Sequence, residues 1–236
     1  MSEFWDANLD SGYYDSIVKE GLKNRRGVQS FWHITTLRLV SEYLIPNTNH
    51  LDYACGPGTL VGLFSQTKSI GVDISEKQIK FANKNYSHKG EFKLVNNFDF
   101  SKNLNKFDVV TVLGLLEFLN EDEIIDLISK INQTLKPGGR IVLTTPNFSG
   151  FMKVLEVILN RFGKVDYSDQ HINKLDSKSI LNIFSENFDF NIKIRNFLNI
   201  SIFFSIFSHK LADKIEKLIS EIFSHKFGCL MIIELS

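Results

Sequence analysis

A glycine-containing turn between two apolar segments is the feature that most constrains this sequence. Residues 51–59 read Leu-Asp-Tyr-Ala-Cys-Gly-Pro-Gly-Thr. Because Gly56 and Gly58 lack a Cβ, the turn can take positive φ angles and a ligand can lie against its backbone. If residues 59–64 begin a helix, the N–H groups of the turn also lie at its positive end, where an anionic group is favoured. The segment therefore predicts a strand that ends in a ligand-binding turn.

Two other interpretations of the turn are open. A nicotinamide or flavin dinucleotide site requires Gly-x-Gly-x-x-Gly, and the third glycine would fall at position 61, which is Val61. This departure disfavours a dinucleotide site. A turn that only joins a strand to a helix, with no ligand, is the second alternative.

An acidic residue follows the next expected strand. Residues 69–72 form a short apolar run that ends in Asp73, and Ser75-Glu76-Lys77-Gln78 is a capping-box sequence that starts a helix. An acidic side chain about 20 residues past the glycine turn can accept hydrogen bonds from both hydroxyls of a ribose. A strand-end aspartate without a ligand is the alternative, and the nearby turn favours the ribose role.

Strand and helix patterns alternate through the rest of the chain. The apolar run led by Asp108 suits a central parallel strand that is covered on both faces. Residues 120–139 predict a capped helix of 3.6-residue period that is closed by Lys-Pro-Gly-Gly. Further expected strands are residues 92–95, 107–112, 140–145, 188–195 and 229–234. The chain is therefore expected to have an α/β fold.

The order of these landmarks resembles the class I S-adenosylmethionine-dependent methyltransferases. The turn at Asp52–Gly58, the strand-end Asp73, Asn97-Phe98 and the Leu-Lys-Pro-Gly-Gly-Arg segment match that family over residues 51–147, although Ala54 replaces its usual first glycine. The resemblance implies a Rossmann-like doubly wound, mostly parallel seven-stranded sheet with helices on both faces. It also implies that the last strand is antiparallel and inserts between the fifth and sixth.

The same resemblance implies S-adenosylmethionine as the cofactor. Asn97 and Phe98 stand where the family has an acidic residue that meets the adenine amino group and an apolar residue that packs on the ring. The Asn97 carbonyl oxygen can still accept a hydrogen bond, and Phe98 can equally be a core residue. The expected cofactor-binding residues are Asp52, Ala54, Cys55, Gly56, Gly58, Asp73, Ile74, Asn97, Phe98 and Leu113.

The acceptor is expected to be a small molecule. The chain lacks the Pro-Pro-Tyr/Phe segment that methyltransferases acting on nucleic-acid or glutamine amino groups carry after the fourth strand, and residues 113–118 stand there instead. Many relatives have a histidine where Phe118 stands. We favour methylation of oxygen by in-line displacement, with a module that binds the cofactor but has lost transfer as the alternative. A nucleotide-binding oxidoreductase is less favoured.

Two histidines are the expected catalytic residues. A sulfonium methyl needs no covalent nucleophile, because an acceptor held within about 3–3.5 Å can displace it directly. An oxygen acceptor must lose a proton, which a histidine can take. His171, near Tyr167 and Asp169 after the fifth expected strand, is the first candidate, against a loop histidine that orders the turn. His33 is the second.

Residues 1–48 are expected to form a helical preamble beside the first strand. Apolar residues recur at helical spacing between positions 31 and 44, and Pro46 stops the element. In the resembled family such a segment often closes over the cofactor. Arg26, Gln29 and His33 are therefore further candidates for contact with it, with packing as the alternative for each.

Composition indicates one cytoplasmic domain spanning residues 1–236. The chain is 43% hydrophobic, and its 27 basic and 27 acidic residues cancel, which gives no electrostatic reason to expect nucleic acid. Its two cysteines form neither a disulfide framework nor a metal site. The N-terminus lacks a basic-then-apolar signal, no transmembrane segment is expected, and the oligomeric state stays open.

Residues 197–226 form an apolar insertion before the last strand. Its first part is a dense apolar run that is too short to span a bilayer, and its second part is a helical stripe of apolar residues. One interpretation is that both parts cover the sheet. The other is that residues 197–223 form an apolar wall of the acceptor pocket or a partner surface, which would favour an acceptor with an apolar part.

Overall fold

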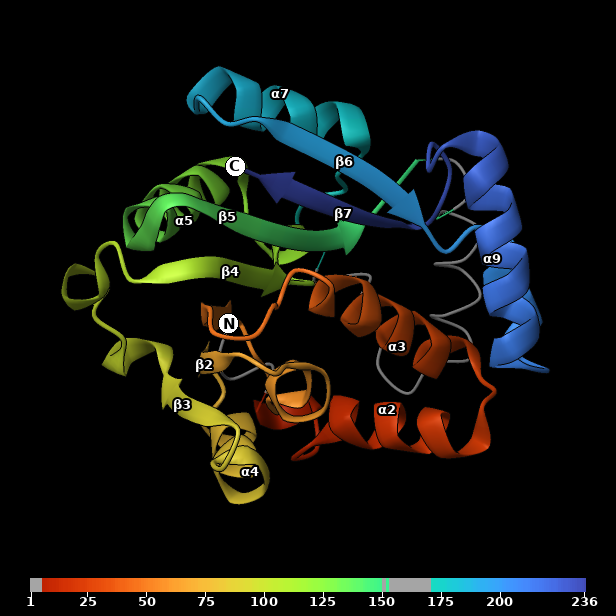
Figure 1. Ribbon diagram of the computed structural model, residues 1–236, viewed down its shortest axis with the longest axis horizontal. Helices are drawn as coiled ribbons and strands as arrows, with labels where there is room; N and C mark the ends of the chain where they lie inside the picture. Colours follow the sequence, from red (N-terminus) through yellow and green to blue (C-terminus); the bar gives the residue numbers. More distant parts are fainter. Residues whose placement is uncertain (1–5, 150–151, 153–170) are drawn as a thin grey trace.

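The computed structural model describes residues 6–149, 152 and 171–236. Its strands are β1 (Asn49–Tyr53), β2 (Lys68–Asp73), β3 (Gly90–Leu94), β4 (Phe107–Leu113), β5 (Leu135–Pro146), β6 (Ile192–Phe197) and β7 (Leu230–Leu235). They form one seven-stranded sheet in the order β3-β2-β1-β4-β5-β7-β6 (Figure 1). Strands β1 to β5 pair in parallel, whereas β7 lies antiparallel between β5 and β6. The predicted sheet and its antiparallel last strand are confirmed.

Helices cover both faces of this sheet. They are α2 (Tyr13–Asn24), α3 (Val28–Ser41), α4 (Glu76–Tyr86), α5 (Glu121–Thr134), α7 (Ser177–Asn187), α8 (Ser201–Phe204) and α9 (His209–Phe223). Alternate residues of each strand point to opposite faces. Val110 and Val112 of β4 therefore join a core with α5 and α7, while Val109 joins a second core with α3 and α8. Apolar residues thus pack on both faces of the central strand, as in a doubly covered sheet.

The helix starts follow local sequence signals. Asn120 and Glu123 form a complete capping box at the start of α5. Ser75 caps α4 by accepting from the Gln78 N–H, and Asp176 caps α7 by accepting from the Ser179 N–H. The strand-to-helix order that positions the site is thus fixed by short-range chemistry.

Most strands lie within two residues of their expected bounds, and three elements differ more clearly. The helix expected over residues 59–64 is a single π-helical turn, Leu60–Phe64, and a helix this short has little dipole to offer an anion. Strand β5 begins at Leu135, so the residues expected to form a turn before position 140 belong to the strand. Its pairing with β4 shifts register between Phe107 and Val109 to accommodate them. Strand β6 begins at Ile192 rather than at position 188, since α7 continues to Asn187 and the chain must turn before pairing.

The preamble is a helix hairpin made by α2 and α3, which lie side by side in Figure 1. Phe31, Val40 and Leu44 are buried in the cluster that also holds residues of the sheet. Both cysteines are free thiols. In the part of the chain that the structure describes, no helix is long and apolar enough to cross a membrane.

Candidate functional site

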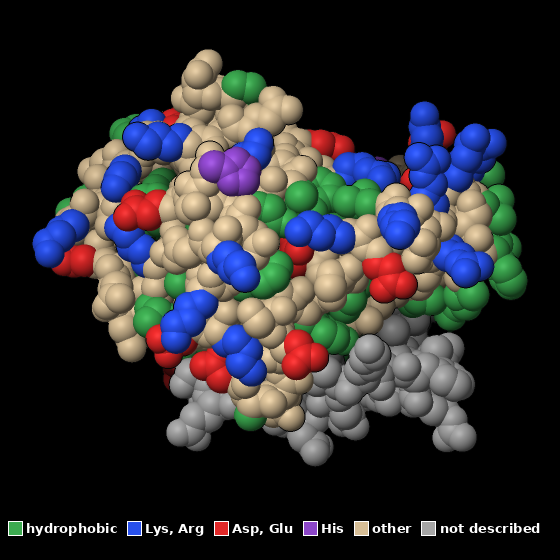
Figure 2. Space-filling model, turned by 90° about the horizontal axis from the view of Figure 1, so that it is seen from below, with side chains coloured by type: hydrophobic (Ala, Val, Ile, Leu, Met, Phe, Trp, Pro, Cys, Tyr) green, Lys and Arg blue, Asp and Glu red, His purple; other side chains and the backbone are tan. Residues whose placement is uncertain are grey.

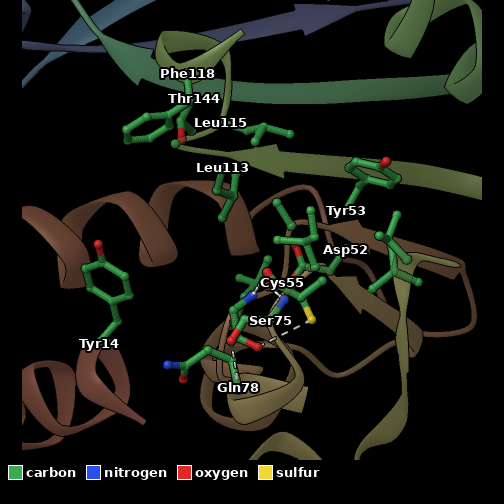
Figure 3. A pocket seen from close by; sticks show the side chains of 18 of the residues that line it. Tyr14, Asp52, Tyr53, Cys55, Ser75, Gln78, Leu113, Leu115, Phe118 and Thr144 are labelled. Atoms are coloured by element: carbon green, nitrogen blue, oxygen red, sulfur yellow. Dashed lines mark hydrogen bonds between the residues drawn. The ribbon is translucent and has the colours of Figure 1, made fainter. Parts of the chain in front are cut away.

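A cavity of about 540 Å³ lies between the α2–α3 hairpin and the carboxyl ends of the parallel strands. In an open α/β sheet this edge is where ligands bind, at the point where the strand order reverses. Here the order reverses between β1 and β4. Figure 3 shows Tyr14 of α2 on one side of the cavity and Asp52, Cys55 and Leu113 on the other. The volume is in the range of small-molecule sites.

Most of the sequence-predicted residues meet in this cavity. Those that line it are Asp52, Ala54, Cys55, Gly56, Asp73, Ile74 and Leu113, together with His33 and His171. Three predicted residues do not line it. Gly58 packs beneath the turn, Asn97 is exposed, and Phe98 is buried in the core with α5. Val95 and Phe100 reach the cavity from the segment after β3 instead.

The glycine turn takes left-handed backbone angles at three alternate positions. Ala54, Gly56 and Gly58 have φ angles of 64°, 51° and 75°. Ala54 therefore adopts the conformation that a glycine would take without strain. A Cβ on Gly58 would lie 2.7 Å from the ring of Phe92, whereas a Cβ on Gly56 would meet no atom within 4 Å. Gly58 is required for packing, and Gly56 leaves the backbone open toward the cavity.

Asp73 ties this turn to the start of α4. Its Oδ2 accepts a hydrogen bond from the Gly56 N–H at 2.7 Å, and its Oδ1 accepts one from the Ser75 N–H at 2.9 Å. Burial raises the pKa of Asp73, and the backbone hydrogen bonds oppose this rise. Each carboxylate oxygen can accept more than one hydrogen bond. Asp73 can therefore hold the turn and still accept from two ligand hydroxyls.

Asp52 ends a buried polar chain that crosses three strands. The Thr111 hydroxyl donates to Asp52 Oδ1 at 2.7 Å, and His50 Nε2 lies 2.8 Å from that hydroxyl. His50 Nδ1 lies 3.0 Å from the Ser69 hydroxyl. Since Thr111 gives its one proton to Asp52, His50 must donate from Nε2 and accept from Ser69. Burial lowers the pKa of His50 to about 3, so its ring is neutral.

Burial also raises the pKa of Asp52 to about 7, partly offset by the Thr111 hydrogen bond. Asp52 is only 2% exposed. The Asp73 carboxyl adds a smaller repulsion that acts in the same direction. Near neutral pH the cavity therefore holds a carboxyl group that a cationic ligand can ionise by binding close to it.

Glu117 is a cavity residue that the sequence interpretation passed over as part of an apolar segment. It is 5% exposed, and its Oε2 accepts a hydrogen bond from the Thr145 hydroxyl at 3.1 Å. Burial raises the pKa of Glu117 to about 7. A single acidic residue within Leu113–Phe118 was the available signal. Perturbed carboxyl groups of this kind are common at functional sites.

The two predicted histidines line the cavity from different segments. His33 of α3 stacks beside Tyr14 with ring centroids 5.0 Å apart, and burial lowers the pKa of His33 to about 4. His171 lies against Phe118 and Phe148, at centroid distances of 5.3 and 5.5 Å. The structure thus brings both histidines to the cavity that Glu117 lines.

The remaining candidates lie elsewhere. Arg26 is exposed on the loop between α2 and α3, and the Gln29 side chain donates to the Tyr13 hydroxyl at 3.3 Å. Neither lines the cavity. Tyr167 and Asp169 lie outside the described residues. Among the described residues, no cluster of His, Cys, Asp or Glu is arranged to hold a metal ion.

One sequence relative is the Uncharacterized protein RP028 of Rickettsia prowazekii (strain Madrid E). It is 23% identical over 150 residues, which are 59% of this chain and 59% of that protein. The match thus spans less than two thirds of the relative's length.

Solved structures share the fold over most of the chain. A SAM dependent methyltransferase from Archaeoglobus fulgidus aligns with a TM-score of 0.60 and 20% identity, covering 95% of this chain and 100% of that chain. Magnesium protoporphyrin IX methyltransferase from Synechocystis PCC 6803, solved with bound SAH, aligns with a TM-score of 0.57 and 19% identity, covering 95% and 96%. At these identities the likeness shows a common fold.

The family assignment comes from the sequence match to a domain family. The family described as "Methyltransferase domain" matches residues 25–193, which is well over half of the chain. This range contains the glycine turn, Asp73 and Glu117. The chain therefore belongs to the methyltransferase domain family, which confirms the class I methyltransferase resemblance of its sequence motifs.

Proposed function

We propose that this protein transfers a methyl group from S-adenosylmethionine to a hydroxyl oxygen of a small-molecule acceptor. The observation that carries the proposal is the pairing of Gly56 with Asp73 at the carboxyl edge of the sheet. Gly56 leaves space where any other residue would place a Cβ, and Asp73 keeps acceptor capacity on both oxygens. These features fit the amino-acid part and the ribose of the donor.

The charge of the cavity also supports this donor. Among the described residues, its lining has five carboxyl groups and one lysine, Lys130, which is paired with Asp126. The donor carries a sulfonium, an ammonium and one carboxylate, so its net charge is positive. A dinucleotide would instead place two phosphate charges among these carboxyl groups, which is unfavourable. The cavity therefore favours the methyl donor over a nicotinamide dinucleotide.

The donor, when bound, supplies a methyl group that an oxygen can displace in line. The chain must then position the acceptor, exclude water and take up the hydroxyl proton. Glu117 suits the last role, because a carboxyl with a pKa of about 7 is a stronger base than an ordinary glutamate and is partly ionised at neutral pH. His33, with a pKa of about 4, is a weaker base. We assign to Glu117 the role of accepting the hydroxyl proton of the acceptor, and to His171 the role of positioning the acceptor.

The acceptor is expected to have an apolar part. Figure 3 shows Leu113, Leu115 and Phe118 together on the β4 side of the cavity, and Trp32 of α3 also lines it. These side chains offer apolar contact beside the Glu117 carboxyl. No residue between positions 197 and 223 lines the cavity, so the insertion does not form a wall of this pocket.

Calorimetry with S-adenosylmethionine tests the donor site. Asp73→Asn removes the charge from two expected hydrogen bonds to the ribose, and we expect affinity to fall by about tenfold or more. Asp99→Asn is a matched control, because Asp99 also accepts from the N–H two residues along the chain but does not line the cavity. Tight binding of NADH with no binding of the methyl donor would contradict the proposal.

Methyl incorporation separates an active enzyme from a module that only binds the donor. The protein is incubated with donor labelled in its methyl group and with small molecules extracted from cells, and the labelled product is identified by mass spectrometry. A labelled ether or ester supports transfer to oxygen. Donor binding without any labelled product would favour the binding module instead.

A further inference from the structure

The segment that contains α8 and α9 carries a concentration of exposed apolar side chains. Of the sixteen large apolar residues that are strongly exposed in the described part of the chain, nine lie between positions 200 and 227. We call these nine the apolar face: Ile200, Phe204, Ile206, Phe207, Leu211, Leu218, Ile222, Phe223 and Phe227. Phe207 alone is 77% exposed. Scattered exposed apolar residues are ordinary, but a group this dense marks a binding surface.

The apolar face is exposed because the other side of α9 is polar and fastened to the protein. Glu216 is buried and accepts hydrogen bonds from the N–H groups of Leu198 and Asn199, both at 3.1 Å. It also accepts from the hydroxyls of Ser201 at 2.6 Å and Ser220 at 3.0 Å. Turning α9 to bury its apolar residues would break the three hydrogen bonds that join Glu216 to Leu198, Asn199 and Ser201 outside the helix. The fold therefore holds the apolar face outward.

Helical spacing places lysines along one flank of this face. At about 100° per residue, Leu211, Leu218 and Ile222 lie within roughly 40° of one another. Lys210, Lys214 and Lys217 lie roughly 90° further round the helix. This is the arrangement of an amphipathic helix that lies in a membrane interface, where lysine stems run along the apolar surface and the charges reach the headgroups.

The neighbouring α2–α3 loop adds two arginines to the lysines. The His209 N–H donates to the Arg25 carbonyl at 2.8 Å, and the Gly27 N–H donates to the Ser205 carbonyl at 2.7 Å, so this loop is joined to the start of α9. We call the exposed cations the basic margin: Arg25, Arg26, Lys210, Lys214, Lys217 and Lys226.

Few acidic residues offset this margin. On α9, Glu221 lies 3.9 Å from Lys217 in an exposed ion pair, and Asp213 is paired with Arg38 at 3.4 Å, so five of the six cations of the basic margin have no acidic partner on this helix. Figure 2 shows hydrophobic side chains on the outer edge of the molecule, at the end where α9 lies, beside a group of Lys and Arg side chains. A symmetric dimer through this face would double the excess of cations, because the same surface supplies both sides. An anionic surface neutralises it.

We propose that the α8–α9 segment binds the surface of an anionic lipid bilayer. The apolar face enters the boundary between headgroups and acyl chains, and the basic margin contacts the anionic headgroups. Helix α9 lies in the plane of the surface. This binding is independent of methyl transfer, because no residue of the apolar face lines the cavity.

Cosedimentation of the full chain with vesicles tests the proposal. We expect binding to mixed phosphatidylcholine–phosphatidylglycerol vesicles and weaker binding to phosphatidylcholine alone. Each basic residue near an anionic surface contributes about fivefold, so the double variant Lys214→Gln, Lys217→Gln should bind mixed vesicles about 25-fold more weakly. The double variant Leu218→Asp, Ile222→Asp should lose more than about tenfold on both vesicle types.

Two matched controls lie on other surfaces. Leu181→Asp changes an apolar residue of α7 that is 46% exposed, and Lys84→Gln changes an exposed lysine of α4. Both should bind vesicles like the wild type, and circular dichroism checks that every variant is folded. If the wild type does not bind mixed vesicles, or if the α9 variants bind as the controls do, the proposal is wrong.

Two further measurements use the wild type alone. Hydrogen exchange of the α9 amides should slow when mixed vesicles are added, and unchanged exchange would contradict binding through α9. Analytical ultracentrifugation tests whether a second copy of the chain, rather than a bilayer, covers the apolar face. A dimer that the variant Leu218→Asp, Ile222→Asp dissociates, with no vesicle binding, would assign the face to a second copy of the chain and overturn the proposal.

Discussion

Replacing Glu117 with glutamine should change how the stability of this protein depends on pH. The carboxyl of Glu117 is 5% exposed, and burial raises its pKa to about 7 from an ordinary value of about 4.5. Glutamine has nearly the same shape and keeps a carbonyl oxygen that can accept the Thr145 hydrogen bond. The substitution therefore removes the titration while retaining the packing.

The direction in which the free energy of unfolding changes with pH depends on whether the folded or the unfolded chain holds the proton. Between about pH 4.5 and pH 7 the folded protein keeps a proton on Glu117 that the unfolded chain releases, so the free energy of unfolding falls as pH rises through this window. One pKa unit corresponds to about 1.4 kcal/mol, so a rise of about 2.5 corresponds to about 3 kcal/mol of unfolding free energy. Asp52, with a pKa of about 7, acts in the same direction and is retained in the variant.

Urea unfolding, followed by circular dichroism from about pH 5 to about pH 9, measures this effect. We expect the free energy of unfolding of the wild type to fall over this range by about 3 kcal/mol more than that of Glu117→Gln. Glu121→Gln, which changes an exposed carboxyl at the start of α5, should follow the wild type. Parallel pH curves for the wild type and Glu117→Gln would refute the assignment of a retained proton to Glu117.

Three further substitutions separate packing, anchoring and catalysis. Gly58→Ala should lower the free energy of unfolding by about 2–4 kcal/mol, because its Cβ meets the Phe92 ring, whereas Gly56→Ala should lower it by about 1 kcal/mol through its φ angle alone; urea unfolding compares them. Glu216→Ala removes the acceptor of four hydrogen bonds and should cost about 3 kcal/mol or more, with Glu216→Gln costing less than half of that in the same assay. His171→Ala should lower methyl incorporation but leave donor affinity in calorimetry nearly unchanged, and an equal loss of both would contradict its role toward the acceptor.

The sequence predicted the parts of the site that local backbone chemistry determines. The turn from Ala54 to Gly58 and the aspartate at the tip of β2 lie where their spacing placed them. The segment after β3 shows why the rest was harder. It forms a 3₁₀ turn at Val95–Asn97, which exposes Asn97 and directs Val95 and Phe100 to the cavity. The face that a residue presents after a strand depends on the path of the loop, and single-residue spacing does not define that path.

Glu117 shows a second limit, because its environment comes from segments that are distant in sequence. Thr145 at the end of β5 supplies its hydrogen bond, and the Asn173 N–H donates to its backbone carbonyl at 3.2 Å. An acidic residue in an apolar run can be an exposed interruption or a buried functional group. Only the position of β5 and of the segment around Asn173 distinguishes these two, and both are properties of the assembled sheet.

Helix α9 illustrates how hydrophobic periodicity can predict a helix and yet leave its orientation open. In α5 the apolar stripe of Ile124, Ile128 and Ile131 is fully buried, as amphipathic spacing normally indicates. In α9 the inward positions include Glu216 and Ser220 instead.

The reason lies in the backbone after β6, where two buried N–H groups need an acceptor and one carboxylate satisfies both. Leaving them unpaired would cost about 1–3 kcal/mol each, which competes with the gain from burying two or three apolar side chains. A stripe of apolar residues therefore marks the buried side of a helix only when no polar residue on the opposite side has to face inward to satisfy buried hydrogen-bonding groups. In α9 Glu216 does so, and the apolar face is left for a surface outside the protein.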